Sequence, residues 1–250
     1  MGLLARIVVS GGRVELACSA TEGVVEIARA DMDPPLPNQA TSGMHSEFEQ
    51  EIVILTGAEV VRRRTGMYFD VHDRDVAATL ALQALCHAID DAIDGRCTQI
   101  FLKIDGAEID VCYDSGMPLE PDAQHPNWTA AQIFLTIHAA CHSRKRHLEV
   151  GSEFCRIGIA VLNAVCSELT AEIRDGGKQL RLRFEQGELR EEAPISATQE
   201  ADETRLHFVL DPSILPDNRP GEDALRRALH DLHSRFPGLK IEMEYASASD

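Results

Sequence analysis

The sequence has few basic side chains for the number of acidic ones that it carries. Its 24 lysines and arginines stand against 41 aspartates and glutamates, which gives a formal net charge of -17 at pH 7. Binding to duplex DNA depends on neutralising phosphates with basic groups, so this balance disfavours direct nucleic-acid binding. Two interpretations stay open: the partners are not DNA, or the protein competes with DNA by resembling its charge.

The sequence also lacks the usual marks of export, disulfide bonding and membrane insertion. Residues 1–12 have no cationic region followed by a long apolar stretch, and no apolar run approaches the roughly 18 residues of a membrane span. The seven cysteines form no CxxC pair, and their odd number and irregular spacing indicate reduced thiols. We therefore expect a cytoplasmic protein that does not insert into a membrane.

A chain of 250 residues with 44% hydrophobic content is long enough for one main domain with an appendage. Three short strand patterns and a linker-like segment (DMDPPLPNQATSG) come first. They predict an N-terminal β module with its linker over residues 1–43 and a main domain over 44–250, with a boundary near Ser42. The expected strands of the module are residues 5–9, 13–19 and 23–28.

In the main domain, helix patterns alternate with pairs of strand patterns. Strand pairs joined by tight turns, such as Asp105-Gly106, predict antiparallel hairpins, and the helices between them predict an α+β fold in two layers. The expected helices are residues 57–68, 80–95, 129–142, 157–169 and 221–236. The expected strands are residues 98–104, 107–114, 169–175, 178–187, 204–210 and 239–245.

The helix expected over residues 80–95 (LALQALCHAIDDAIDG) has an apolar stripe and a polar stripe. Residues of the polar stripe recur at spacings of three and four, which is typical of a catalytic row on a helix. The row nevertheless begins with an amide and an imidazole. Its members are Gln83, His87, Asp90, Asp91 and Asp94.

Five segments in this order resemble the ATPase domain of DNA gyrase B and topoisomerase IV, within the GHKL group of ATPases. They are EVVRRRTGMY (59–68), CHAIDDAIDG (86–95), SGMP (115–118), LTIHAA (135–140) and IGIAVLNAVCSEL (157–169). The resemblance runs from about Thr56 to about Tyr245. It implies a Bergerat-type two-layer sandwich of helices and a mixed, mainly antiparallel sheet, preceded here by the small β module.

The resemblance also implies roles for positions on the first long helix. Gln83 matches the glutamate that acts as general base in the family, and an amide has no proton-accepting pKa near neutrality. This loses a contribution of roughly 10²- to 10⁴-fold to hydrolysis. His87 matches the asparagine that holds Mg²⁺, a hard cation that prefers oxygen ligands. Magnesium binding in the family's way is therefore not expected, and no metal site is predicted.

At the end of the second strand of the hairpin that follows, the adenine-reading aspartate of the family matches Cys112 when SGMP is aligned with the family's RGIP. A thiol is a weak hydrogen-bonding group, so the strong bond to adenine would be lost. Asp114, on the same strand face, is the alternative adenine-reading residue. The family's Arg–Glu ion pair on this strand and helix matches Ser115 and Asp91, so both partners have become smaller.

The segment that binds phosphates in the family, GGLHGVG, matches SEFCRIG (152–158) here. Glycine amides wrap the phosphates in the family, but only Gly158 remains in this sequence, and Arg156 is the one new side chain suited to a phosphate. The rest of the nucleotide pocket would be an apolar floor that fixes no phosphate. That floor consists of Gly116, Met117, Pro118 and Thr204.

Since base, magnesium ligand, adenine anchor and lid glycines all differ together, the sequence predicts a catalytically degenerate gyrase-B-like domain without a bound cofactor. It would act through a protein partner, either a component of gyrase or topoisomerase or a second copy of itself, or by binding a different small ligand in the old pocket. One alternative is a GHKL protein that still binds ATP and magnesium with residual or altered ATPase activity. The other is an acidic DNA mimic.

A further pattern, His138, Cys141 and His142, is either a metal-ligand face or an ordinary helix end.

Overall fold

The computed structural model describes residues 5–10, 13–18, 55–123, 125–137, 154 and 156–246. The chain divides into two units, residues 1–55 and 56–250. In the first unit, β1 (Ala5–Ser10) and β2 (Arg13–Cys18) pair antiparallel from Ala5 opposite Cys18 to Ser10 opposite Arg13. The third expected strand, the linker and the boundary near Ser42 lie outside the described residues, so the domain limits stay a prediction.

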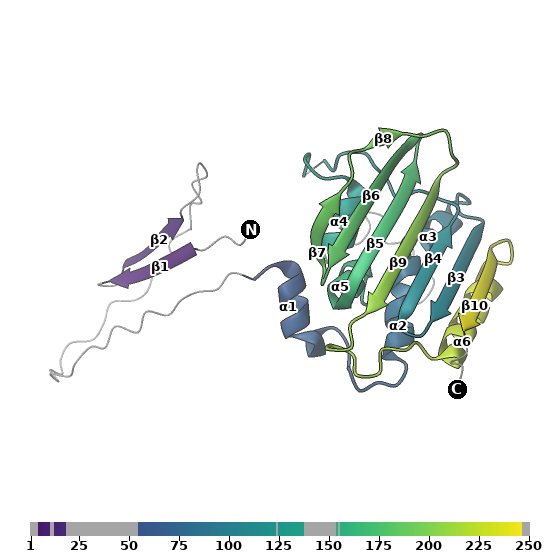
Figure 1. Ribbon diagram of the computed structural model, residues 1–250, viewed down its shortest axis with the longest axis horizontal. Coiled ribbons are helices and arrows are strands. Elements are labelled where there is room, and N and C mark those ends of the chain that lie inside the picture. The colour runs from purple at the N-terminus through teal and green to yellow at the C-terminus, as the bar shows by residue number, and fades with distance from the viewer. Residues whose placement is uncertain are drawn as a thin grey trace. The chain divides into compact units, whose positions relative to one another are not determined.

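The second unit is built on an eight-stranded sheet with the order β10-β3-β4-β9-β5-β6-β7, and β8 also pairs with β6 (Figure 1). Only the β10–β3 pairing is parallel among the described strands. The mixed, mainly antiparallel sheet confirms the expected fold class. The strands are β3 (Gln99–Asp105), β4 (Glu108–Tyr113), β5 (Cys166–Asp175), β6 (Lys178–Glu185), β7 (Glu188–Glu192), β8 (Ser196–Ala197), β9 (Glu203–Leu210) and β10 (Lys240–Ala246).

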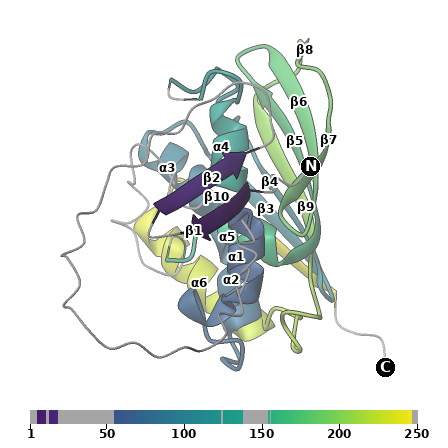
Figure 2. The ribbon, with the colours of Figure 1, turned by 90° about the vertical axis from the view of Figure 1, so that its left-hand side faces the viewer.

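The helices of this unit lie on one face of the sheet and leave the other face open. Figure 1 looks onto the open face, and Figure 2 shows the sheet from its edge with the helices on one side. This is the two-layer arrangement that the alternation of helix and strand patterns predicts. The helices are α1 (Gly57–Arg63), η1 (Thr65–Met67), α2 (Val76–Leu82), η2 (Gln83–Leu85), α3 (Cys86–Ile93), α4 (Ala130–Thr136), α5 (Ile159–Val165) and α6 (Glu222–Arg235).

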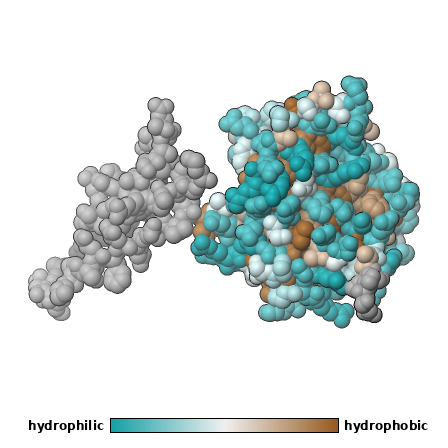
Figure 3. Space-filling view, viewed as in Figure 1, coloured by the Kyte–Doolittle hydropathy of each residue, from teal (hydrophilic) through white to brown (hydrophobic). Residues whose placement is uncertain are grey.

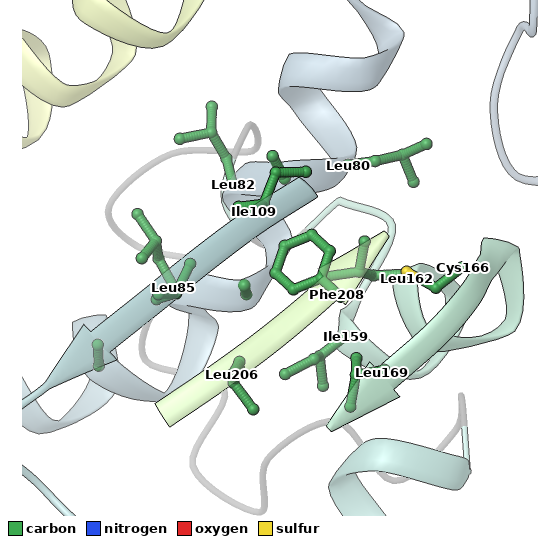
Figure 4. Packing of buried hydrophobic residues seen from close by; sticks show 14 of the residues in the cluster. Leu80, Leu82, Leu85, Ile109, Ile159, Leu162, Cys166, Leu169, Leu206 and Phe208 are labelled. Carbon is green, nitrogen blue, oxygen red and sulfur yellow. The ribbon is translucent and has the colours of Figure 1, made fainter. Parts of the chain in front are cut away.

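Alternation along the strands separates the core from the open face. In β4, Ile109, Val111 and Tyr113 are buried on the helix side, whereas Asp110 and Cys112 are only half-buried on the other side. Figure 4 shows how buried side chains of α2, η2 and α5 meet those of β4, β5 and β9 around the ring of Phe208. The open face, seen in Figure 3, is mainly hydrophilic with scattered apolar side chains.

Four helices differ from their expected limits. The helix expected over 57–68 ends as an α-helix at Arg63 and is followed by the 3₁₀ turn η1. The helix expected over 80–95 begins at Val76 and contains a 3₁₀ turn at Gln83–Leu85. The helix expected over 157–169 ends at Val165, because the chain continues at Cys166 as a strand whose buried residues follow a period of two. The helix expected over 129–142 is observed as far as Thr136, and residues after 137 lie outside the described part.

The expectation about apolar runs is wrong in one place. Residues Val76–Ile93 form a helical stretch that is long and apolar enough to cross a membrane by length and composition alone. Of this stretch, 83% is buried inside the structure. The core helix of a soluble protein has the same properties, so the stretch is weak evidence for a membrane span.

Candidate functional site

Four of the five residues of the polar stripe face the interior of the domain, and the fifth, Asp94, is exposed. Gln83, His87, Asp90 and Asp91 are exposed by no more than 3%. The His87 ring lies stacked on the Tyr113 ring from β4, with 6.0 Å between ring centres, and near Phe134 from α4 at 6.1 Å. Buried polar side chains require hydrogen-bonding or charged neighbours, so their partners define what this site does.

Gln83 connects the long helical stretch to the start of α5. Its Nε2 donates to the carbonyl oxygen of Thr79 at 2.8 Å, and its Oε1 accepts from the backbone N–H groups of Ile157 at 3.2 Å and Gly158 at 2.9 Å. Gly158 has a φ of 93°, a conformation that favours glycine. The structure therefore brings Gln83 and Gly158 together, as expected, but through a direct hydrogen bond that the sequence did not predict.

His87 and Asp91 lie one helical turn apart and interact across 3.6 Å between Nδ1 and Oδ2. Asp91 also forms an ion pair with Arg96, which is half exposed just after α3. Asp91 thus has an ion-pair partner after all: Arg96 supplies the positive charge that was expected to be missing because position 115 is a serine. A basic residue shortly after a helix end is only a weak signal of an ion pair, so the sequence did not predict the pairing of Arg96 with Asp91.

The adenine-reading positions expected at Cys112 and Asp114 are not brought together with Gln83 and His87. Cys112 lies on the open face of the sheet, where burial and the nearby Glu203 raise the pKa of its thiol to about 11. At the end of β4 it is Tyr113 that faces the helices, and burial raises the pKa of its hydroxyl well above the ordinary value. The alternation of β4 was the signal that could have identified Tyr113.

Asp114 instead joins the end of β4 to the start of β3. Its carboxylate accepts hydrogen bonds from the backbone N–H groups of Thr98 at 2.8 Å and Gln99 at 2.9 Å, and from the Thr98 hydroxyl. Partial burial raises the pKa of Asp114, but the hydrogen bonds outweigh burial and lower the pKa below its ordinary value of 3.8. Asp114 is a structural residue at the surface.

An Asp114→Asn variant should therefore be less stable at neutral pH. A carboxyl whose pKa is lowered by folding contributes stability above its ordinary pKa, and this contribution is lost as the pH falls through the lower pKa of the folded state. Because the side chain is exposed, we expect a loss of about 1 kcal/mol at pH 7, which shrinks towards zero as the pH falls through the lowered pKa of the folded state. Urea unfolding at several pH values measures this, and an equal loss at both ends of the range would contradict it.

Thr204 of β9 holds the segment 115–118. The residues expected to form the floor of the nucleotide pocket therefore do lie together. The Thr204 hydroxyl donates to the carbonyl oxygen of Ser115 at 2.9 Å and accepts from the N–H of Met117 at 3.1 Å. A side chain at Gly116 would lie 2.2 Å from the carbonyl oxygen of Arg174, so only glycine fits. Pro118 accepts from Ala131 through its carbonyl oxygen at 3.1 Å, which ties the segment to α4.

The segment that matches the family's phosphate-binding lid is only partly described. Phe154 is fully buried, and its carbonyl oxygen accepts a hydrogen bond from the Cys86 thiol. Arg156 is exposed, and it directly precedes Ile157, whose N–H donates to Gln83. His138, Cys141 and His142 lie outside the described residues, and no cluster of three potential metal ligands occurs in the part of the chain that is described.

The sheet order and the helices on one face (Figure 2) fit the two-layer fold that the resemblance to GHKL ATPase domains implies. The fold resembles that of the topoisomerase IV ATP-binding domain of Francisella tularensis, whose structure was solved with a small-molecule inhibitor. The TM-score is 0.61, the sequence identity is 22%, and the match covers 77% of this chain and 91% of that one. This likeness establishes the fold.

In sequence, the chain is related to the B proteins of DNA gyrase and DNA topoisomerase 4, which confirms the expected resemblance. It is 27% identical to gyrase B of Thermotoga maritima over 205 residues, which are 80% of this chain and 32% of that protein. It is 26% identical to the topoisomerase 4 protein of Rickettsia typhi over 172 residues, which are 67% of this chain and 26% of that protein. The chain thus spans about a quarter to a third of the length of these relatives. No protein-family model matches the chain.

Proposed function

We propose that this protein is a gyrase-B-like ATPase-domain protein whose nucleotide site is closed by its own side chains, and that it acts by binding another protein. The proposal rests on one observation: Gln83 Oε1 accepts hydrogen bonds from the backbone N–H groups of residues 157 and 158. In the related ATPases, backbone N–H groups of this lid serve the phosphates. Here the neutral side chain of Gln83 accepts hydrogen bonds from two of these N–H groups.

The residues at the family's nucleotide positions do not fit ATP and Mg²⁺. Gln83 has no basic oxygen for activating water, and its amide oxygen and nitrogen are both engaged with the backbone. His87 offers nitrogen rather than oxygen to a hard cation, and the nearby Asp91 carboxylate is paired with Arg96. Tyr113, fully buried against His87, fills space on the helix side of β4. We derive no hydrolytic step from this site.

The two alternatives have less support. ATP binding with altered activity would require Gln83 to release the two lid N–H groups and Tyr113 to leave a buried position. A DNA mimic needs carboxylates gathered without counter-charges, whereas carboxylates on the open sheet face alternate with arginines. Examples are the ion pairs Glu172–Arg181, Glu203–Arg205 and Glu168–Arg183.

The partner that the comparisons favour is a component of DNA gyrase or topoisomerase IV, because the relatives carry the names of such components. The protein would then modulate a topoisomerase in the cytoplasm, without a membrane or direct DNA contact. A pull-down from an extract of the native host, with this chain as bait, tests this partner. The captured protein is then identified.

Titration of a fluorescent ATP analogue tests the closed site. We expect no saturable binding at micromolar concentrations, with or without Mg²⁺, because the lid N–H groups of residues 157 and 158 and the face of β4 are occupied. A Gln83→Glu, His87→Asn double variant restores the family's base and magnesium ligand in sequence, but it should not restore hydrolysis because Tyr113 and Phe154 stay in place. Micromolar binding by the unmodified protein would favour the ATP-binding alternative instead.

A further inference from the structure

The two edges of the sheet differ in how well they are protected against pairing with another chain. At one edge, β7 and β8 are five and two residues long, Pro194 lies between them, and the β6–β7 register shifts between Arg183 and Phe184. Short strands, prolines and bulges protect sheet edges. At the other edge, β10 pairs with β3 over seven consecutive residues without a register shift or a proline (Figure 1).

The pairing of β10 with β3 determines which backbone groups of β10 point to the open edge of the sheet. The Lys240 N–H points to β3, where it donates to the carbonyl oxygen of Thr98 at 2.8 Å. In a parallel pair, the residues that bond a neighbour alternate with residues whose N–H and C=O point the opposite way. Ile241, Met243 and Tyr245 therefore present their backbone groups to the open edge, and no described strand pairs with them there.

The sequence of β10 is complementary to itself in one antiparallel register. With a twofold axis at Glu242, Ile241 of one copy lies opposite Met243 of the other, and these pairs exchange backbone hydrogen bonds. In the same register Lys240 lies opposite Glu244 of the other copy, which gives two attractive pairs on the open face. The two Glu242 side chains face each other, which is one repulsive pair against the two attractive ones, and Lys240 of the same chain lies 2.7 Å from each.

Shifting the register by one pairing step removes this complementarity. With the axis at Met243, Glu242 would lie opposite Glu244 twice, and like charges in directly opposed positions are destabilising. Ile241, Met243 and Tyr245 also pack only partly against the core, so a neighbouring strand and its helix would bury more of them. We propose that two copies of this chain pair through β10 in the register centred on Glu242 and form one sheet across the dimer.

Sedimentation equilibrium with the full chain tests the proposal. We expect a dimer of twice the 27.5 kDa chain mass. In Met243→Pro the outward N–H is lost while the bonds to β3 remain, so this variant should be folded and monomeric. Circular dichroism and urea unfolding report whether it has folded.

A charge exchange provides a second test that leaves the backbone unchanged. Lys240→Glu should weaken the dimer by about tenfold, because it makes two attractive pairs repulsive, and adding Glu244→Lys should restore it. An unmodified chain that stays monomeric at high concentration overturns the proposal, and so does a dimer that is indifferent to Met243→Pro and to the charge exchange. The proposal does not depend on the closed nucleotide site, since ATP binding and dimer mass are measured separately.

Discussion

Replacing Tyr113 by alanine is expected to lower the free energy of unfolding by about 4 kcal/mol, as usual for removing a large buried aromatic side chain. The ring is fully buried between β4 and the long helical stretch, stacked on His87. Its removal leaves a cavity beside an imidazole that a rigid core cannot close completely. Urea unfolding monitored by circular dichroism measures the loss.

The matched control for this change is Tyr113→Phe, which keeps the ring and removes only the hydroxyl. If the ring stabilises the site by filling it, this control should cost no more than about 1 kcal/mol. A loss of similar size in both variants would mean that the hydroxyl, rather than the volume of the ring, is what matters. That result would remove Tyr113 from the explanation of the closed site.

Gln83→Leu should cost about 3 kcal/mol, because leucine has nearly the same size but cannot accept the N–H groups of Ile157 and Gly158. A buried donor left without a partner costs about 1–3 kcal/mol, and this variant leaves two. Amide hydrogen exchange should speed up selectively at residues 157 and 158, since their protection depends on the Gln83 oxygen.

The control for Gln83→Leu is the same chemical change at an exposed position. Gln179 donates to Ser196 Oγ at 3.0 Å on the surface, and Gln179→Leu should change stability by no more than about 0.5 kcal/mol. If the amides of residues 157 and 158 exchange as slowly in Gln83→Leu as in the unmodified protein, other groups hold the lid and the proposed role of Gln83 is wrong.

The fold could be predicted because its signals are local. Hairpins at Asp105-Gly106 and Gly176-Gly177 and the apolar stripe of the long helix are properties of short segments, and the order of five segments resembles one family. The end of β4 could not be predicted in the same way. Aligning SGMP placed Cys112 at the adenine position, but a shift of one residue exchanges the two faces of a strand, and Tyr113 faces the helices.

The contacts of Gln83 were beyond sequence reasoning for a different reason. Its partners are backbone N–H groups far along the chain, and such groups carry no signature of residue type. The resemblance placed an amide at the family's general-base position, but it did not reveal the hydrogen bonds that this amide accepts. The pairing of Asp91 with Arg96 was missed because sequence alone does not show which of several basic residues reaches a buried carboxylate.

The parallel pairing of β10 with β3 has a consequence for how the domain folds. It joins Gln99 to Lys240, so this pairing closes a loop that contains most of the domain. Closing so long a loop is entropically unfavourable before other contacts exist, and contacts distant in sequence slow folding. During synthesis, β3 remains an unpaired edge on that side until the last strand has left the ribosome. A nascent chain stalled before residue 240 would therefore present the β3 edge to chaperones.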